Sequence, residues 1–212
     1  MGIGYNEGNH IPWRWLPVPV PADKYPLLLE ETERLLKKLE EHDLPSLIHT
    51  QDVAKVTKEF IRFLRLPRET SMPIILAALL HDIGKLRVAS GILQKPHGID
   101  AIEQILIQVH SNHGASIIQE GGLFPPEVAE MVEQHHEHYD GSGYPGQLTG
   151  SSITRGAQII GICDVFAMLR EDRVTQKART LAEAKEYLAK NKAWFAPDIY
   201  ESFLQYVAEN YG

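Results

Sequence analysis

Apolar and polar residues follow helical spacing along most of the chain from residue 26 onward. One apolar stripe, faced by Glu and Lys residues, fades near Asp43, and a second begins near Ser46. The run Ile74–Leu80 is apolar on every side, which is typical of a helix in the middle of a bundle. Later helices are predicted near 99–108, 113–120, 126–138, 152–170, 181–190 and 197–210. Strand patterns are almost absent, so the sequence predicts an all-α fold.

Proline and glycine indicate the ends of the central helix. Pro73 directly precedes the apolar run. It suits a first helical turn, where its missing N–H removes no hydrogen bond. Gly84 follows the run and offers a C-terminal stop. We therefore expect this helix to begin near Pro73 and to end before Gly84.

The first 25 residues differ in composition from the rest of the chain. They are rich in proline, which excludes a helix and favours an extended path. The prolines in and next to this segment are Pro12, Pro17, Pro19, Pro21 and Pro26. Trp13 and Trp15 would point to one side of it, and we expect them to lie against the main body or a partner chain. The sequence thus predicts an extended Pro-rich N-terminal arm (1–25), an N-terminal helix (26–43) and a main helical domain (44–212).

Composition and charge exclude several classes of protein. With 212 residues, 43% of them hydrophobic and 23% charged, the chain suits one folded domain of good size. The net charge of −7, without a run of Lys and Arg, argues against binding to duplex nucleic acid. The sequence has no signal-peptide pattern and no apolar run long enough for a bilayer, so we expect a cytoplasmic protein without membrane contact. Cys163 is the only cysteine, which excludes a thiolate-rich zinc site.

Histidines and aspartates recur at wide, even intervals along the predicted helices. They are His49, His81, Asp82, His110, His135 and Asp164. Successive positions in this set (49, 81, 110, 135 and 164) lie 25 to 32 residues apart, about one helix plus a connection. A helical fold could therefore direct all of these side chains to one point. Asp164 interrupts an apolar run, where a buried carboxylate is costly without a cation or a proton. Taken alone, His81 and Asp82 could simply cap a helix end, whereas the whole set predicts a metal site.

The ligand types indicate the kind of metal and of reaction. Imidazoles and carboxylates without thiolates suit iron, manganese, cobalt or nickel, with zinc as an alternative. Four histidines and two aspartates exceed the needs of one ion, so we predict two divalent ions bridged by Asp82, with a bridging hydroxide that attacks phosphorus. Their excess positive charge would favour an anionic substrate. Lys85, one helical turn after Asp82, could hold a phosphate oxygen, although a surface lysine fits the spacing equally well.

The residues after His135 carry weaker signals. His136 could be a ligand, a substrate contact or a support for a ligand. Glu137 and Asp140 could orient the ligating histidines. The segment D-G-S-G-Y-P (140–145) is expected to be a loop whose glycines permit a close approach to a ligand.

Two motifs carry a resemblance to a known family. H-D-I-G-K (81–85) and H-H-E-H-Y-D-G-S-G-Y-P (135–145) together resemble the HD-GYP family, a branch of the HD superfamily of metal-dependent phosphohydrolases. The likeness extends from about His49 to Arg173. It implies an HD-domain helical bundle, so that 44–212 becomes an HD-GYP-like catalytic domain. It also implies a binuclear or trinuclear metal centre, often of iron, and hydrolysis of cyclic di-GMP to pGpG or GMP.

The resemblance implies roles for individual residues. The ligands of one metal would be His49, His81, Asp82 and Asp164, and those of the second Asp82, His110 and His135. Asp82 and Lys85 would be the catalytic residues, and Lys85, Arg173 and Tyr144 would contact the substrate. Iron is the favoured ion and manganese the second choice, ahead of zinc, cobalt and nickel.

The chain also departs from the family pattern. Pro45 stands where trinuclear members carry a glutamate, which favours two metals and leaves His136 without its usual role at a third. Ala167 replaces a second acidic residue, and Gln158 and Gln176 replace basic residues that bind the substrate. The sequence therefore predicts an intact metal site with fewer basic residues around it to bind the substrate.

Three functional hypotheses follow from these patterns. The leading one is a metal-dependent phosphodiesterase that hydrolyses cyclic di-GMP, a small-molecule nucleotide. The second is an HD phosphohydrolase that acts on another nucleotide or phosphoester, and the third is a non-catalytic module that binds nucleotides or proteins. A homodimer or a signalling-protein partner is compatible with each of them.

Overall fold

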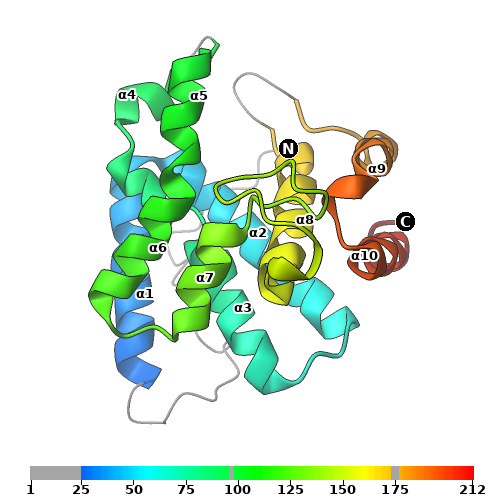
Figure 1. Cartoon of the computed structure of the whole chain (residues 1–212), viewed down its shortest axis with the longest axis horizontal. Coiled ribbons are helices and arrows are strands. Elements are labelled where there is room, and N and C mark those ends of the chain that lie inside the picture. Colours follow the sequence, from blue (N-terminus) through cyan, green and yellow to red (C-terminus); the bar gives the residue numbers. More distant parts are fainter. Residues whose placement is uncertain (1–24, 96–97, 173–176) are drawn as a thin grey trace, which may run out of the picture.

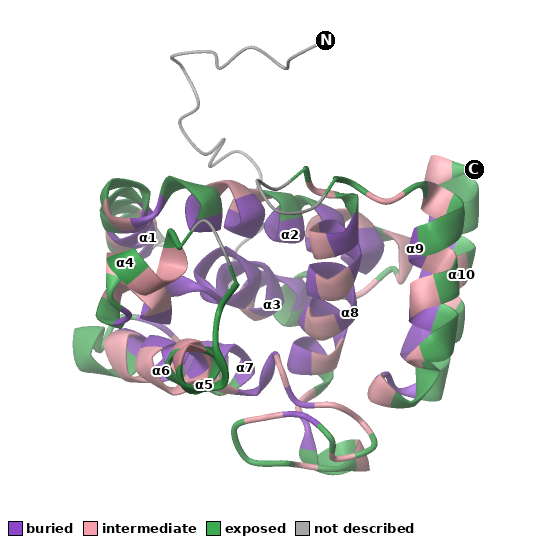
Figure 2. Ribbon diagram, turned by 90° about the horizontal axis from the view of Figure 1, so that it is seen from above, coloured by how far each residue is buried: buried purple, intermediate pink, exposed green. Residues whose placement is uncertain are grey.

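Three helices form the centre of the structure, namely α2 (Leu44–Phe63), α3 (Arg68–Leu80) and α8 (Arg155–Arg170). The computed structural model describes residues 25–95, 98–172 and 177–212. Each of the three helices contacts the other two, and together they occupy the middle of the molecule (Figure 1). Every residue from Ile74 to Leu80 is at most 7% exposed, and Figure 2 shows that buried residues dominate α3. The all-apolar run therefore forms the predicted central helix.

Two groups of helices cover this centre on opposite sides (Figure 1). One group consists of α1 (Tyr25–His42), α6 (His110–Gly121) and α7 (Pro126–Gln134), and the other of α9 (Leu181–Lys190) and α10 (Pro197–Tyr211). The short helices α4 (Ser90–Leu93) and α5 (Ala101–Gln108) adjoin the first group. Three 3₁₀ turns complete the described elements: η2 (Ile83–Arg87), η3 (Gly150–Ser152) and η4 (Lys192–Trp194). The described part of the chain contains no strand, only an isolated bridge between Asp140 and Thr149, so the all-α prediction is confirmed.

The expected start of the central helix is wrong, whereas the helix ends before Gly84 as expected. The helix begins at Arg68, and Pro73 lies inside it. The proline removes the hydrogen bond to the carbonyl of Glu69, but Glu69 is exposed, so water can bind that oxygen. The helix ends at Leu80, whereas Gly84 lies in η2 and packs against the backbone of α6. The glycine thus serves a close approach of two segments and is not the helix stop.

The remaining predicted helices all occur; α9 has the predicted bounds, and the others have shifted ends. The helix expected over 126–138 ends at Gln134, and the one expected over 113–120 begins at His110. α1 begins at Tyr25, and its leucines Leu28, Leu35, Leu36 and Leu39 are buried in the common core. The predicted arm with Trp13 and Trp15 lies outside the described residues, and the division of the chain at 25 and 43 stays a prediction.

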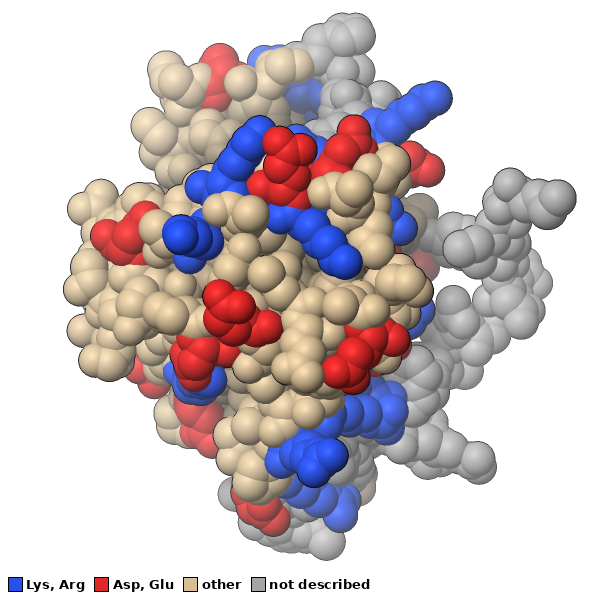
Figure 3. All heavy atoms as spheres, turned by 90° about the vertical axis from the view of Figure 1, so that its right-hand side faces the viewer, with Lys and Arg blue, Asp and Glu red and all other residues tan. Residues whose placement is uncertain are grey.

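The outer surface carries charges of both signs. Lys and Arg side chains are interspersed with Asp and Glu side chains on the face around α9 and α10 (Figure 3). Among the described helices, none has the length and hydropathy needed to cross a membrane.

Candidate metal centre

Ends of helices deliver three of the predicted ligands. His81 is the residue directly after α3, His135 the residue directly after α7, and His110 opens α6 close to the end of α5. His49 and Asp164 instead project from the middle of α2 and α8. All six predicted ligands are at most 7% exposed. The fold therefore brings the whole predicted set together, as the regular spacing indicated.

The three histidines at helix ends are held in the same way. Each ring places Nδ1 against the backbone carbonyl three residues earlier in the chain. The distances are 2.9 Å from His81 to Ala78, 2.7 Å from His110 to Ile107 and 2.6 Å from His135 to Val132. Because a carbonyl only accepts, Nδ1 must carry the proton and donate it, which leaves the lone pair on Nε2. This orientation of the ring is the one that metal-binding histidines usually adopt.

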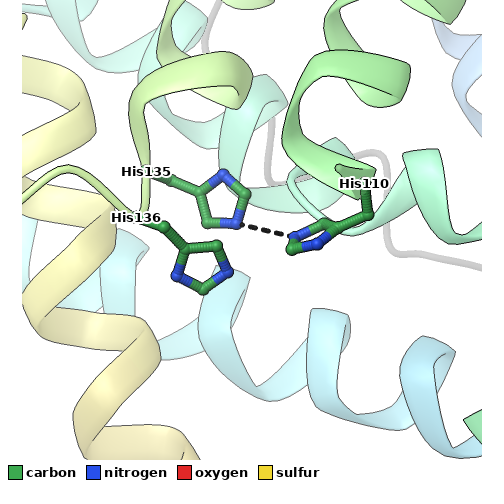
Figure 4. Close-up of side chains that lie close together, drawn as sticks. All are labelled: His110, His135 and His136. Atoms are coloured by element: carbon green, nitrogen blue, oxygen red, sulfur yellow. Dashed lines mark hydrogen bonds between the residues drawn. The ribbon is translucent and has the colours of Figure 1, made fainter. Parts of the chain in front are cut away.

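The Nε2 atoms face one another without protons to share. Nε2 of His110 and Nε2 of His135 lie 3.3 Å apart, and His136 lies beside them (Figure 4). Two lone pairs at this distance repel each other unless a cation lies near both. Among the described residues, Nε2 of His81 also has no hydrogen-bond partner, although the side chain is 1% exposed. Such buried acceptors without donors fit a divalent cation.

Asp82 connects two groups of ligand atoms. Within each group the atoms lie within 4.8 Å of one another; the groups are His49, His81 and Asp82, and His110, His135 and His136. Asp82 Oδ2 lies 3.6 Å from His81 Nε2 in the first group, and Asp82 Oδ1 lies 3.4 Å from His110 Nε2 in the second. One oxygen of the carboxylate therefore faces each group, as a bridging ligand requires.

Asp82 is ionised although it is buried. Burial by itself would raise the pKa of this carboxyl, but Lys85 and the neighbouring histidines hold it well below its usual range. Lys85 Nζ lies 2.6 Å from Asp82 Oδ2, and the lysine side chain is 18% exposed. The predicted catalytic pair is thus in direct contact, and the lysine lies at the edge of the site.

His49 lies between two carboxylates. Its Nε2 is 2.7 Å from Asp164 Oδ1, and its Nδ1 is 3.2 Å from Glu171 Oε2. Burial opposes a charge on His49, but its hydrogen bonds to Asp164 and Glu171 outweigh it and raise the pKa to about 9. His49 correspondingly lowers the pKa of Asp164 against the effect of burial. The sequence prediction included Asp164 but missed Glu171.

The second group of histidines is neutral. Burial lowers the pKa of His110 to about 4, and burial together with repulsion from a protonated His110 lowers the pKa of His136 to about 3. The pKa of His135 is lowered for the same reasons, by burial first and by its histidine neighbours second. Neutral imidazoles are the form that binds metal ions.

These shifts predict an acid-sensitive metal-free protein. The folded pKa of His110 lies below the unfolded value of about 6.5, so stability is present above pH 6.5 and is lost as the pH falls towards 4. For His110 alone the loss is about 3 kcal/mol. His49 opposes this loss only slightly, because its raised pKa keeps it protonated in the fold throughout and the unfolded imidazole is already mostly protonated below pH 6.5. The measurement is urea unfolding of chelator-treated protein at pH 7, 5.5 and 4. His110→Asn should show a clearly smaller fall, and an equal fall in both proteins would contradict this assignment.

The loop 140–145 lies beside the second group. The ring of Tyr144 is 4.7 Å from the ring of His136, centroid to centroid. Glu137 does not orient a ligand, contrary to expectation: its buried carboxylate accepts hydrogen bonds from the backbone N–H groups of Gly146 and Leu148. Asp140 likewise binds within the loop, to the N–H and hydroxyl of Ser142. Both acids therefore shape the loop that places Tyr144.

The positions that depart from the family pattern have structural roles of their own. Gln158 donates from its amide to the carbonyls of Gly150 and Ile153, which fixes η3 to α8. Ala167 is buried, and Pro45 is exposed in the first turn of α2. The predicted contact Arg173 and the position of Gln176 lie outside the described residues.

The chain is similar to several known proteins in sequence and in fold. The chain is 31% identical over 172 residues to a cyclic di-GMP phosphodiesterase of Pseudomonas aeruginosa, covering 81% of this chain and 42% of that protein. It is 33% identical over 160 residues to 3′3′-cGAMP-specific phosphodiesterase 2 of Vibrio cholerae, covering 74% of this chain and 31% of that protein. Among solved structures, an HDG"Y"P protein from Bdellovibrio bacteriovorus shares the fold with a TM-score of 0.61 at 21% identity, over 76% of this chain and 50% of that one.

The chain spans less than half the length of these two curated relatives. A family model for the HD domain matches residues 18–199, which include all six predicted ligands and both motifs. The chain therefore belongs to the HD domain family, and the motifs at 81–85 and 135–145 place it in the HD-GYP branch.

Proposed function

We propose that this chain is a metal-dependent phosphodiesterase that hydrolyses cyclic dinucleotides, with cyclic di-GMP as the first candidate and pGpG or GMP as the product. The observation that carries the proposal is the position of Asp82, whose two oxygens face two separate groups of imidazoles. A centre for two divalent ions explains this arrangement, since paired ions supply the Lewis acidity for attack by water on a phosphodiester.

The donor set supports particular ions and ligands. His49, His81, Asp82 and Asp164 would hold one ion, and Asp82, His110 and His135 the other, with His136 as a further ligand or a substrate contact. Only imidazoles and carboxylates are present in the cluster, which suits iron or manganese better than a thiolate-preferring ion.

Side chains around the cluster would bind the substrate. Lys85 lies at the edge of the site, where its ammonium group can turn from Asp82 to a phosphate oxygen once cations neutralise that carboxylate. Tyr144 lies beside His136 and offers an aromatic face there. Arg173 remains a third proposed contact.

The likeness to relatives named for two substrates supports the class of cyclic dinucleotides more strongly than one member of it. Both substrates present phosphodiester groups to the enzyme. A cytoplasmic location and a homodimer or signalling partner are compatible with the proposal and stay predictions.

The test is turnover after anaerobic loading with Fe(II) or Mn(II). Cyclic di-GMP, 3′3′-cGAMP and the generic diester bis(p-nitrophenyl) phosphate are assayed side by side, and products are separated by chromatography. We expect hydrolysis of at least one cyclic dinucleotide, and loss of that activity after chelation. Turnover of the generic diester with none of either dinucleotide would contradict the proposed substrate class.

A second candidate is an HD phosphohydrolase for another nucleotide or phosphoester. Gln158 supports it, because its amide is occupied by two loop carbonyls and no cation stands at this position to bind phosphate. The same assay decides between the two candidates, with linear nucleoside phosphates as additional substrates.

A further inference from the structure

His49 is held differently from the other histidines of the site. His81, His110 and His135 each donate from Nδ1 to a neutral backbone carbonyl three residues earlier in the chain. Nδ1 of His49 instead faces Glu171 Oε2, a side-chain carboxylate oxygen directly after α8, at 3.2 Å. His49 is therefore the one of these four whose orientation depends on a side chain.

Glu171 is well placed to fix this ring. It directly follows Arg170, the last residue of α8, and its side chain is 14% exposed. Asp164 lies seven residues earlier, inside α8, and both acids contact His49 of α2. His49 thus meets one carboxylate at each ring nitrogen, with Asp164 at Nε2 and Glu171 at Nδ1.

We propose that Glu171 is a positioning residue for the metal ion that His49 binds, an inference that rests on the proposed function. When an ion takes the lone pair of Nε2, the proton of the ring must stay on Nδ1. Glu171 accepts that proton in a hydrogen bond, which fixes the tautomer, orients the ring and makes Nε2 a stronger donor. Glu171 makes no direct contact with the ion in this arrangement.

The proposal distinguishes the two ions of the site. His110 and His135 have their own backbone acceptors, so removal of Glu171 should weaken only the ion at His49, His81 and Asp82. Loss of such an outer carboxylate typically lowers metal affinity roughly 10- to 100-fold. A general loss of negative charge would instead weaken both ions by comparable factors.

The experiment compares Mn(II) binding by the full chain and three variants. Glu171→Leu removes the acceptor, and Glu171→Gln keeps an acceptor oxygen without the charge. Asp52→Asn is the matched control, since Asp52 is exposed on α2 three residues after His49, and its charge acts on both His49 and Glu171. Free Mn(II) is followed by electron paramagnetic resonance, and thermal unfolding of each metal-free variant reports the fold.

We expect two Mn(II) ions per wild-type chain. Glu171→Leu should bind one of them roughly 10- to 100-fold more weakly and the other with unchanged affinity. Glu171→Gln should show a smaller loss at the same ion, and Asp52→Asn should stay within about twofold of wild type.

Three results would overturn the inference. They are wild-type affinity in Glu171→Leu, an equal loss at both ions, and a loss in Asp52→Asn as large as in Glu171→Leu. In each case wild-type protein still binds two ions, so the proposed function is untouched. Wild-type protein that binds no divalent ion would instead contradict the proposed function itself.

Discussion

Replacing Asp82 with alanine is expected to remove both bound metal ions and to lower kcat on the order of 1,000-fold or more, which corresponds to about 4 kcal/mol of transition-state stabilisation. The physical reason is that one carboxylate serves two groups of histidines, at 3.6 Å from His81 and 3.4 Å from His110. Its removal also leaves Lys85 beside buried imidazoles without the acid that balances its charge.

Metal content by mass spectrometry and kcat on a cyclic dinucleotide measure the two effects of Asp82→Ala separately. Asp198→Asn is a suitable control, because Asp198 lies in the first turn of α10 and forms an exposed ion pair with Arg155. This variant should keep two ions and wild-type kcat. Retained activity in Asp82→Ala would refute the bridging role.

Gly84→Ala should destabilise the fold by roughly 3 kcal/mol or more, at the upper end of the usual range for overpacking. A Cβ atom at this position would lie 1.8 Å from the carbonyl oxygen of His110 and 2.4 Å from the backbone N of Gly114. Both obstacles are backbone atoms of α6, so no side-chain rotation can relieve them. The variant must push α6 away from η2, and His110 would move out of the site with it.

Urea unfolding measures the stability loss of Gly84→Ala, and metal titration measures the displacement of His110. Gly91→Ala is the matched control, because a Cβ there would meet nothing within 4 Å. The control should unfold like wild type. Equal stability of the two variants would mean that η2 and α6 do not pack as closely as described.

The sequence predicted the fold class and the convergence of the six ligands for a simple reason. Apolar stripes with helical spacing fix which faces pack together, and ligands spaced by about one helix and one connection can reach one point inside a helical bundle. Helix ends were predicted less well. Pro73 resembles a first-turn residue, yet the polar segment from Arg68 continues the helix backwards because exposed carbonyls tolerate a proline there.

Contacts between segments far apart in the chain could not be predicted. Glu171 stands in R-E-D-R and resembles an ordinary surface charge; only its distance of seven residues from Asp164, two helical turns, could have drawn attention to it. The role of Gly84 depends on how closely η2 approaches α6, which periodicity does not report. Glu137 was assigned to the histidines because it adjoins them in sequence, whereas its side chain turns to the loop.

The carbonyls that hold His81, His110 and His135 have a wider consequence. They belong to the last turns of α3, α5 and α7, so each imidazole connects the centre of the site directly to the backbone of a different helix. An ion bound between these rings would act as a cross-link among helices that are distant in sequence, closing large chain loops as a covalent bridge would. The partial negative charges at these carboxyl ends also point towards the same place and favour a cation there. Metal content would then govern the cooperativity of unfolding for the whole bundle. The site would stabilise the fold as well as carry out the reaction.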